Sequence, residues 1–140
     1  MMLMFDTNIV VDIISKRDGY EDSTQLFRCC ELGLADGFVS VTTVTDVMYI
    51  LRKHIEPNLV KEAVRTLLLI VDVVGVLKSD IISAFSSDMN DYEDAVQSSC
   101  AARLRADYIV TRNLKDFENS SIQAILPCEA LRIVGTYLAT

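Results

Sequence analysis

Short, uninterrupted apolar runs recur along the chain and are separated by longer segments of mixed polarity. β-branched residues dominate several of these runs, which is typical of strands that are buried on both faces. Each run is only four to six residues long, within the usual length of a strand. The pattern therefore predicts five buried strands, at residues 2–5, 37–40, 71–76, 107–111 and 122–126.

The segments between these runs place apolar residues at helical spacing, which predicts amphipathic helices. Pro57 and Pro127 are expected at the first position of their helices, because proline lacks the N–H that goes unpaired there. Thr7 or Asn8 is expected to cap the first helix and Ser79 a later one. The predicted helices cover residues 9–14, 21–34, 43–53, 57–70, a segment after Ser79, 91–105 and a segment from Pro127.

Strands that alternate with helices predict an α/β fold whose parallel sheet is covered by helices on both faces. The chain has 140 residues and no linker-like or repeated stretch. We therefore expect a single domain over residues 1–140, since one domain usually takes roughly 100–200 residues. In such sheets ligands bind beyond the carboxyl ends of the strands, so acidic residues at those ends become candidates for a site.

The formal net charge of −7 bears on the choice of partner. An acidic surface repels a nucleic-acid backbone, unless the carboxylates are gathered where cations neutralise them. The same charge would also suit a basic protein partner.

Targeting and cysteine patterns favour a cytoplasmic protein without a membrane anchor. The longest apolar runs are far shorter than a bilayer span, and the amino-terminal segment lacks the basic leader and cleavage site of a signal peptide. The cysteines follow neither zinc-site nor secreted-disulfide spacing, so we expect small buried apolar residues in a reducing compartment. They are Cys29, Cys30, Cys100 and Cys128.

Four aspartates are expected at one edge of the predicted sheet. Asp6 ends the first strand, Asp46 lies in the helix after the second, Asp94 begins a later helix, and Asp116 follows the fourth strand. Any one of them could simply complement a helix dipole or lie in a loop. Together they would raise one another's pKa unless a cation compensated their charge.

The chemistry of these side chains favours a hard divalent ion. Oxygen ligands without nearby histidine or cysteine suit Mg²⁺ or Mn²⁺ better than Zn²⁺. Such an ion can activate water and stabilise charge on a phosphodiester, so the cluster predicts phosphodiester hydrolysis.

Four segments resemble the PIN domain family, and in particular the VapC-like toxins of toxin–antitoxin pairs. They are Phe5–Asp12, Phe38–Asp46, Asp91–Gln97 and Ala106–Phe117, in the family's order and over nearly the whole chain. The resemblance implies a three-layer α/β/α fold with a central parallel sheet and an endoribonuclease that depends on Mg²⁺ or Mn²⁺. It also implies an RNA substrate, a small antitoxin partner and a homodimer.

Residue by residue, the resemblance assigns catalytic roles to Asp6, Asp46, Asp94 and Asp116. Asp6, Asp94 and Asp116 would be direct metal ligands. Asp46 stands where the family usually carries glutamate, so its shorter arm would reach the metal through a water.

Three neighbouring residues are assigned lesser roles. Asn113 stands where many family members have the fourth aspartate, and it is expected to support the site by hydrogen bonds, together with Thr7. Arg112 would lie beside the site and is a candidate contact for an RNA phosphate, or an ordinary exposed arginine.

Two alternatives remain open at this stage. A catalytically weak PIN module that acts by binding protein or RNA would explain the departures at Asp46 and Asn113. A receiver or haloacid-dehalogenase-like phosphatase would use Asp6 as a nucleophile, although Asp6-Thr7-Asn8 lacks the Asp-x-Asp pair of the latter.

Overall fold

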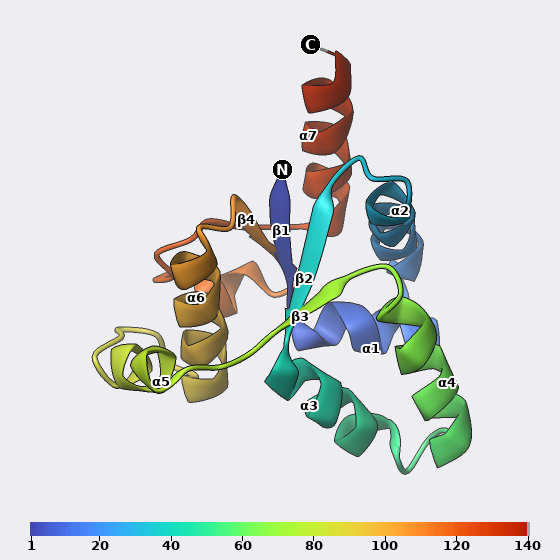
Figure 1. Ribbon diagram of the computed structural model, residues 1–140, viewed down its shortest axis with the longest axis horizontal. Helices are drawn as coiled ribbons and strands as arrows, with labels where there is room; N and C mark the ends of the chain where they lie inside the picture. The colour runs from blue at the N-terminus through green and yellow to red at the C-terminus, as the bar shows by residue number, and fades with distance from the viewer. Residues whose placement is uncertain (140) are drawn as a thin grey trace.

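The computed structural model describes residues 1–139, with side chains as far as Gly135. All the strands and helices predicted from the sequence are present, and a short 3-10 helix, η1, is added (Figure 1). The elements are β1 (Met2–Phe5), α1 (Thr7–Ser15), α2 (Tyr20–Glu31), β2 (Asp36–Ser40), α3 (Val41–Leu51), α4 (Pro57–Leu67), β3 (Asp72–Val74), α5 (Lys78–Phe85), α6 (Tyr92–Leu104), β4 (Tyr108–Val110), η1 (Leu114–Phe117), β5 (Ala124–Ile125) and α7 (Pro127–Ala139).

Within the described residues, five parallel strands form one sheet in the order β3-β2-β1-β4-β5. The central strand β1 pairs with β2 through Leu3 and Gly37, and with β4 through Phe5 and Val110. The chain moves outward from β1 in one direction to β3 and then returns to β4 on the other side. The strand order thus reverses beside β1, where parallel sheets open a crevice for ligands at their carboxyl edge.

Side chains that alternate along β1 contribute to two separate cores. Leu3 and Phe5 pack with residues of α1 to α4 and α7, whereas Met4 packs with residues of α5, α6 and η1. Figure 1 shows α5 and α6 on one side of the strands, with α1, α2 and α4 on the other. The predicted three-layer α/β/α fold with a central parallel sheet is confirmed.

Gly37 lets β2 approach its neighbours closely. A Cβ atom built on this residue would lie 2.8 Å from the Phe5 ring and 2.9 Å from both Cys30 Sγ and Val71. A side chain at this position would therefore push β2 away from β1 and α2.

Several local predictions need correction. Ser79 lies inside α5 instead of capping it, because the helix starts at Lys78 and the Asp80 carboxylate accepts the Leu77 N–H at 2.9 Å. Asp6, not Thr7 or Asn8, occupies the N-cap position of α1. Cys30 and Cys100 are buried as predicted, but Cys128 is exposed.

Over residues 1–139, no helix is both long and apolar enough to cross a bilayer.

Candidate functional site

A cleft of about 410 Å³ opens at the carboxyl edge of the sheet, between α3 on one side and α6 and η1 on the other. All four predicted catalytic aspartates line it, as does Thr7. Asn113 and Arg112 are not among its lining residues, whereas Asp91 and Glu93 are. The full lining is Asp6, Thr7, Asn8, Asp46, Tyr49, Ile50, Asp91, Glu93, Asp94, Gln97 and Asp116.

Asp6 forms the floor of the cleft, where it is 2% exposed. Gln97 Nε2 donates to its Oδ1 at 3.2 Å, and Thr111 Oγ1 donates to its Oδ2 at 2.9 Å. Burial raises the pKa of Asp6 above the ordinary value, although these donated hydrogen bonds oppose that shift. The carboxylate is thus held in one orientation by α6 and by the end of β4.

Asp94 lies in the first turn of α6, which Asp91 begins by accepting the Asp94 N–H at 3.0 Å. Burial, followed by repulsion from Asp6 and other nearby carboxylates, raises the pKa of Asp94 to about 7. A carboxyl group with such a pKa is half protonated near neutral pH in the absence of a cation. The acids of the cleft therefore share an uncompensated negative charge.

Asp46 and Glu93 add charge from opposite walls of the cleft. Asp46 comes from the second turn of α3, and partial burial raises its pKa. Repulsion by Asp46, more than burial, raises the pKa of Glu93. Glu93 thus joins the acidic cluster, although its position beside Asp94 in the sequence did not mark it for a role.

Hydroxyl groups connect the helix starts below the cleft. Thr7 Oγ1 and Thr43 Oγ1 lie 2.9 Å apart, and Ser40 Oγ accepts the Thr43 N–H at 3.3 Å. Thr7, Ser40 and Thr43 are all buried. This network fixes the start of α1 against the start of α3, and the supporting role of Thr7 in the site stays a prediction.

The segment after β4 contains Asn113 and Arg112, whose predicted roles the structure describes in more detail. The Asn113 backbone N–H donates to Thr111 Oγ1 at 3.1 Å, and Thr111 in turn donates to Asp6. Arg112 Nε lies 3.2 Å from Oδ2 of the buried Asp12. Its guanidinium is therefore occupied by an internal ion pair, and the contact with an RNA phosphate stays a prediction.

Gln97 and Thr111 hydrogen-bond to Asp6, and the sequence did not single out either of them as a candidate. Gln97 follows Asp94 by three residues on α6, so both occupy the same face of the helix. Thr111 directly follows a strand that pairs with β1. Helical spacing from Asp94 would have identified Gln97, but Thr111 required knowledge of which strands are neighbours.

Oxygen ligands for a cation are abundant in this cleft, although they are not preassembled. Carboxylates, the Gln97 amide and hydroxyl groups are the donor types that a hard divalent cation prefers. Within residues 1–139, no three Asp, Glu, His or Cys side chains converge closely enough to form a complete metal site. The donor chemistry fits such a cation, and its binding would have to draw the carboxylates together.

Comparison with known proteins gives a consistent assignment at the level of fold and family. The family model described as the PIN domain matches residues 2–115. No curated protein matches the chain.

Solved structures with the same fold cover most of the chain. A chain of the VapBC2 complex from Rickettsia felis, bound to a promoter DNA fragment, has a TM-score of 0.72 and 18% identity, and the match covers 90% of this chain and 98% of that one. A toxin–antitoxin complex from Klebsiella pneumoniae has a TM-score of 0.67 and 21% identity, covering 89% and 97%. VapC20 from Mycobacterium tuberculosis, a toxin that cleaves the sarcin–ricin loop, has a TM-score of 0.63 and 11% identity, covering 76% and 86%.

Proposed function

The chain belongs to the PIN domain family, and from this membership we propose that it is a metal-dependent endoribonuclease, the toxin of a toxin–antitoxin pair. The observation that carries the proposal is the cleft in which Asp6, Asp46, Asp94 and Asp116 meet without a basic side chain among its lining residues. Such a concentration of carboxylates is unfavourable unless a cation is bound. The position at the reversal of strand order is where ligands bind in sheets of this kind.

The cofactor in this proposal is Mg²⁺ or Mn²⁺, held directly by Asp6, Asp94 and Asp116. Asp46, with its shorter side chain, would contribute through a water. When bound, the cation would lower the pKa of a water and stabilise negative charge on a phosphodiester.

The other side chains of the site prepare these carboxylates. Gln97 and Thr111 fix both oxygens of Asp6, so the carboxylate keeps its orientation whether or not a cation is present. Asp94 has a pKa of about 7 and would lose its proton on binding. Cation affinity should therefore increase with pH up to about pH 7.

The structural neighbours supply the biological setting of the proposal. Two of them are toxin–antitoxin complexes, and a third is a toxin that cuts an RNA loop. By analogy, we propose an RNA substrate, a small antitoxin partner and a homodimer. A ribonuclease of this kind would act in the cytoplasm, where its substrate is found.

A second candidate function is a catalytically weak PIN module that binds protein or RNA. The observation in its favour is that the acids of the described residues do not already form a complete metal site. A receiver or phosphatase is no longer an alternative, because the family is established and the strand order differs from that of receiver-like folds.

Thermal unfolding with and without millimolar Mn²⁺ tests the proposal first. A ligand that binds only the folded state at a hundredfold excess over its dissociation constant stabilises that state by about 2.7 kcal/mol. We expect a rise in the melting temperature of the wild type that is lost in Asp94→Asn, together with Mn²⁺-dependent cutting of RNA by the wild type alone. Melting temperatures that ignore Mn²⁺ in both proteins would favour the binding module.

A further inference from the structure

An exposed tyrosine and arginine lie next to the acidic cleft, outside the group of carboxylates. Tyr49 lines the cleft and is 65% exposed. The Arg52 guanidinium carbon lies 3.6 Å from the centroid of the Tyr49 ring. Asp46 and Tyr49 on α3 and Arg52 directly after its end follow one another at intervals of three residues, so they form a continuous stripe that leads out of the cleft.

The ring of Tyr49 lies against Arg52 and is otherwise largely exposed. Arg52 also donates to the Tyr49 carbonyl oxygen, which fixes the guanidinium on the same turn. An aromatic ring that is mostly exposed contributes little to the core and leaves much of its surface free for another planar group.

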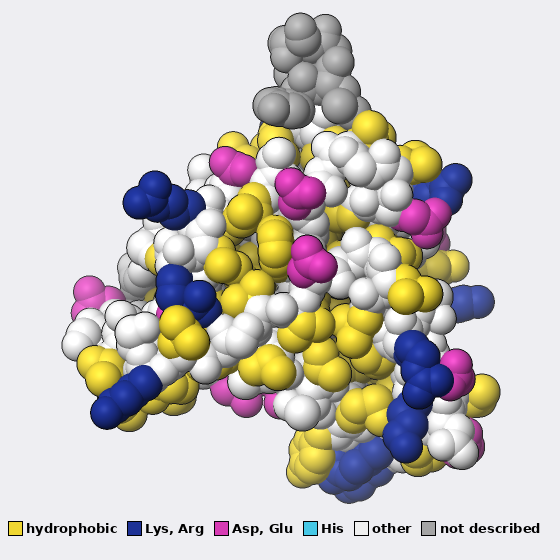
Figure 2. All heavy atoms as spheres, viewed as in Figure 1, with side chains coloured by type: hydrophobic (Ala, Val, Ile, Leu, Met, Phe, Trp, Pro, Cys, Tyr) yellow, Lys and Arg dark blue, Asp and Glu magenta, His cyan; other side chains and the backbone are white. Residues whose placement is uncertain are grey.

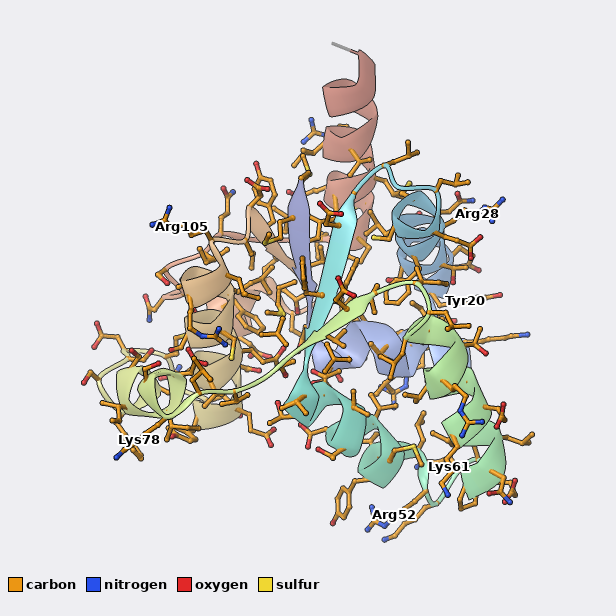
Figure 3. The ribbon with its side chains drawn as sticks, viewed as in Figure 1. Tyr20, Arg28, Arg52, Lys61, Lys78 and Arg105 are labelled. Carbon is orange, nitrogen blue, oxygen red and sulfur yellow. The ribbon has the colours of Figure 1, made fainter. Side chains whose placement is uncertain are left out.

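Arg52 forms no ion pair with a carboxylate among the described residues, and neither does Arg105 at the end of α6, which is not among the residues that line the cleft. Arg17, Arg28, Arg65, Arg103 and Arg112 each form an ion pair with an aspartate or glutamate. No such pair involves Arg52 over residues 1–139. Figure 3 shows Arg52 near the end of α3, and Figure 2 shows basic side chains gathered at this lower edge of the molecule. A protein with a net charge of −7 thus presents, beside its acidic cleft, a guanidinium whose charge no carboxylate neutralises.

We propose that Tyr49 and Arg52 form a nucleotide subsite, in which an unpaired base stacks on Tyr49 and the adjoining phosphate contacts Arg52. Aromatic rings stack on bases of any sequence, and arginine pairs well with phosphate. Bases inside a duplex are already stacked on one another and cannot use the ring. The inference rests on the proposed ribonuclease function and assigns Tyr49 and Arg52 as the side chains that would hold one nucleotide of its RNA substrate.

Equilibrium binding to an uncut strand provides the test. Fluorescein-labelled single-stranded RNA would be titrated with Asp94→Asn protein in Mn²⁺, and the same titration would use an abasic strand of equal length. Adding Tyr49→Leu should weaken binding of the RNA by about tenfold and leave the abasic strand unaffected, since one stacked base contributes on this order. Tyr49→Phe should bind RNA as Asp94→Asn alone does, because the ring is retained.

Two further variants distinguish base stacking from the charge contact with phosphate and from nonspecific effects of a Tyr→Leu substitution. Arg52→Gln should weaken binding of both strands and reduce the salt dependence by about one phosphate contact. Tyr20→Leu makes the same change at α2, away from the residues that line the cleft, and should leave RNA binding unchanged. Melting temperatures of all variants would verify that each is folded.

The possible outcomes distinguish the subsite from the ribonuclease proposal. Equal binding of RNA by Tyr49→Leu and its parent, while wild-type protein cuts that RNA, would overturn the subsite alone and leave the exposed ring to a protein partner. If Tyr49→Leu weakened binding of the RNA and of the abasic strand equally, base stacking on Tyr49 would also be ruled out. Absence of cutting and of any Mn²⁺-dependent melting shift in the wild type would remove both proposals.

Discussion

Two regions of this molecule keep aspartates away from water, and they do so by opposite means. Asp80 is 3% exposed between α5 and α6, where Arg103 Nε donates to both of its carboxylate oxygens at 3.2 Å. Asp6 and Asp94 lie at the carboxyl edge of the sheet with other acids and without an arginine. The same residue type is compensated in one region and left uncompensated in the other.

The pKa values follow this difference. Hydrogen bonds from Arg103 and from the Leu77 N–H outweigh burial and hold the pKa of Asp80 below its ordinary value. In the cleft, burial and neighbouring carboxylates raise the pKa of Asp94 to about 7. Asp12 lies between these two cases: burial raises its pKa, and the nearby Arg112 and Arg17 offset that rise only in part. The acids of the cleft lack an arginine partner and have raised pKa values, and groups of this kind are candidates for a functional site.

The largest expected effect comes from removing charge in the uncompensated region. Asp94→Asn should lower RNA cleavage by about 100-fold or more, because it removes a proposed metal ligand. Stability of the metal-free protein should stay the same or rise, since repulsion is relieved. Initial rates and melting curves measured on one preparation would check both parts.

Asp88→Asn provides the matched control for this experiment, since Asp88 is exposed and does not line the cleft. Cleavage by this variant should match that of the wild type. Wild-type rates in Asp94→Asn would contradict the assignment of the cleft.

The compensated region should respond in the opposite sense. Asp80→Asn should destabilise the protein by about 2 kcal/mol, because Arg103 and the Leu77 N–H lose a charged acceptor in a largely buried setting. Urea unfolding measures this change. The Mn²⁺-dependent rise in melting temperature should be unaffected, and its disappearance would show that the two regions are coupled.

The pH dependence of the free energy of unfolding distinguishes the two regions in the wild-type protein, without any substitution. Asp94 has a higher pKa in the folded state than its ordinary 3.8, so the folded state holds its proton longer and unfolding becomes easier as pH rises from about 4 to 7. Because Asp94 is partly exposed to water, only part of this shift reaches the free energy of unfolding. That free energy should fall by about 1–2 kcal/mol over this range in metal-free protein. Asp80 has a lowered pKa, so its contribution is complete above pH 4 and declines only in more acidic solution.

Asp94→Asn should remove most of the fall in the free energy of unfolding between pH 4 and 7. Urea unfolding at intervals across this range, in a chelating buffer, provides the measurement. A wild-type stability that is constant or increases toward pH 7 would contradict the assigned pKa.

Periodicity and position in the chain predicted the fold well because the core depends on them directly. The alternation of Leu3, Met4 and Phe5 places successive side chains in opposite cores, and an acid after such a strand must reach the carboxyl edge. The placement of Asp6, Asp46, Asp94 and Asp116 along one cleft followed from the same rule. That all 140 residues form one domain, and that these acids are catalytic, stay predictions.

The environment of each acid could not be predicted in this way. Arg103 lies far from Asp80 in the chain, and Arg112 far from Asp12, so nothing in the local sequence reveals their pairing. Thr111 reaches Asp6 only because β4 is the neighbour of β1. Charge compensation is a property of tertiary packing, and it separates the structural acids from those of the cleft.

The smallest expected effect concerns the length of one acid within the uncompensated region. Asp46→Glu adds one methylene on the wall that faces Glu93, and should let the carboxylate reach a cation without an intervening water. We expect a tighter apparent Mn²⁺ affinity and a few-fold faster cleavage, equivalent to less than about 1 kcal/mol. Cleavage rates at a series of Mn²⁺ concentrations would measure both. Asp46→Asn should shift the same curve toward weaker binding, and if both variants bound Mn²⁺ like the wild type, Asp46 would have no part in holding the cation.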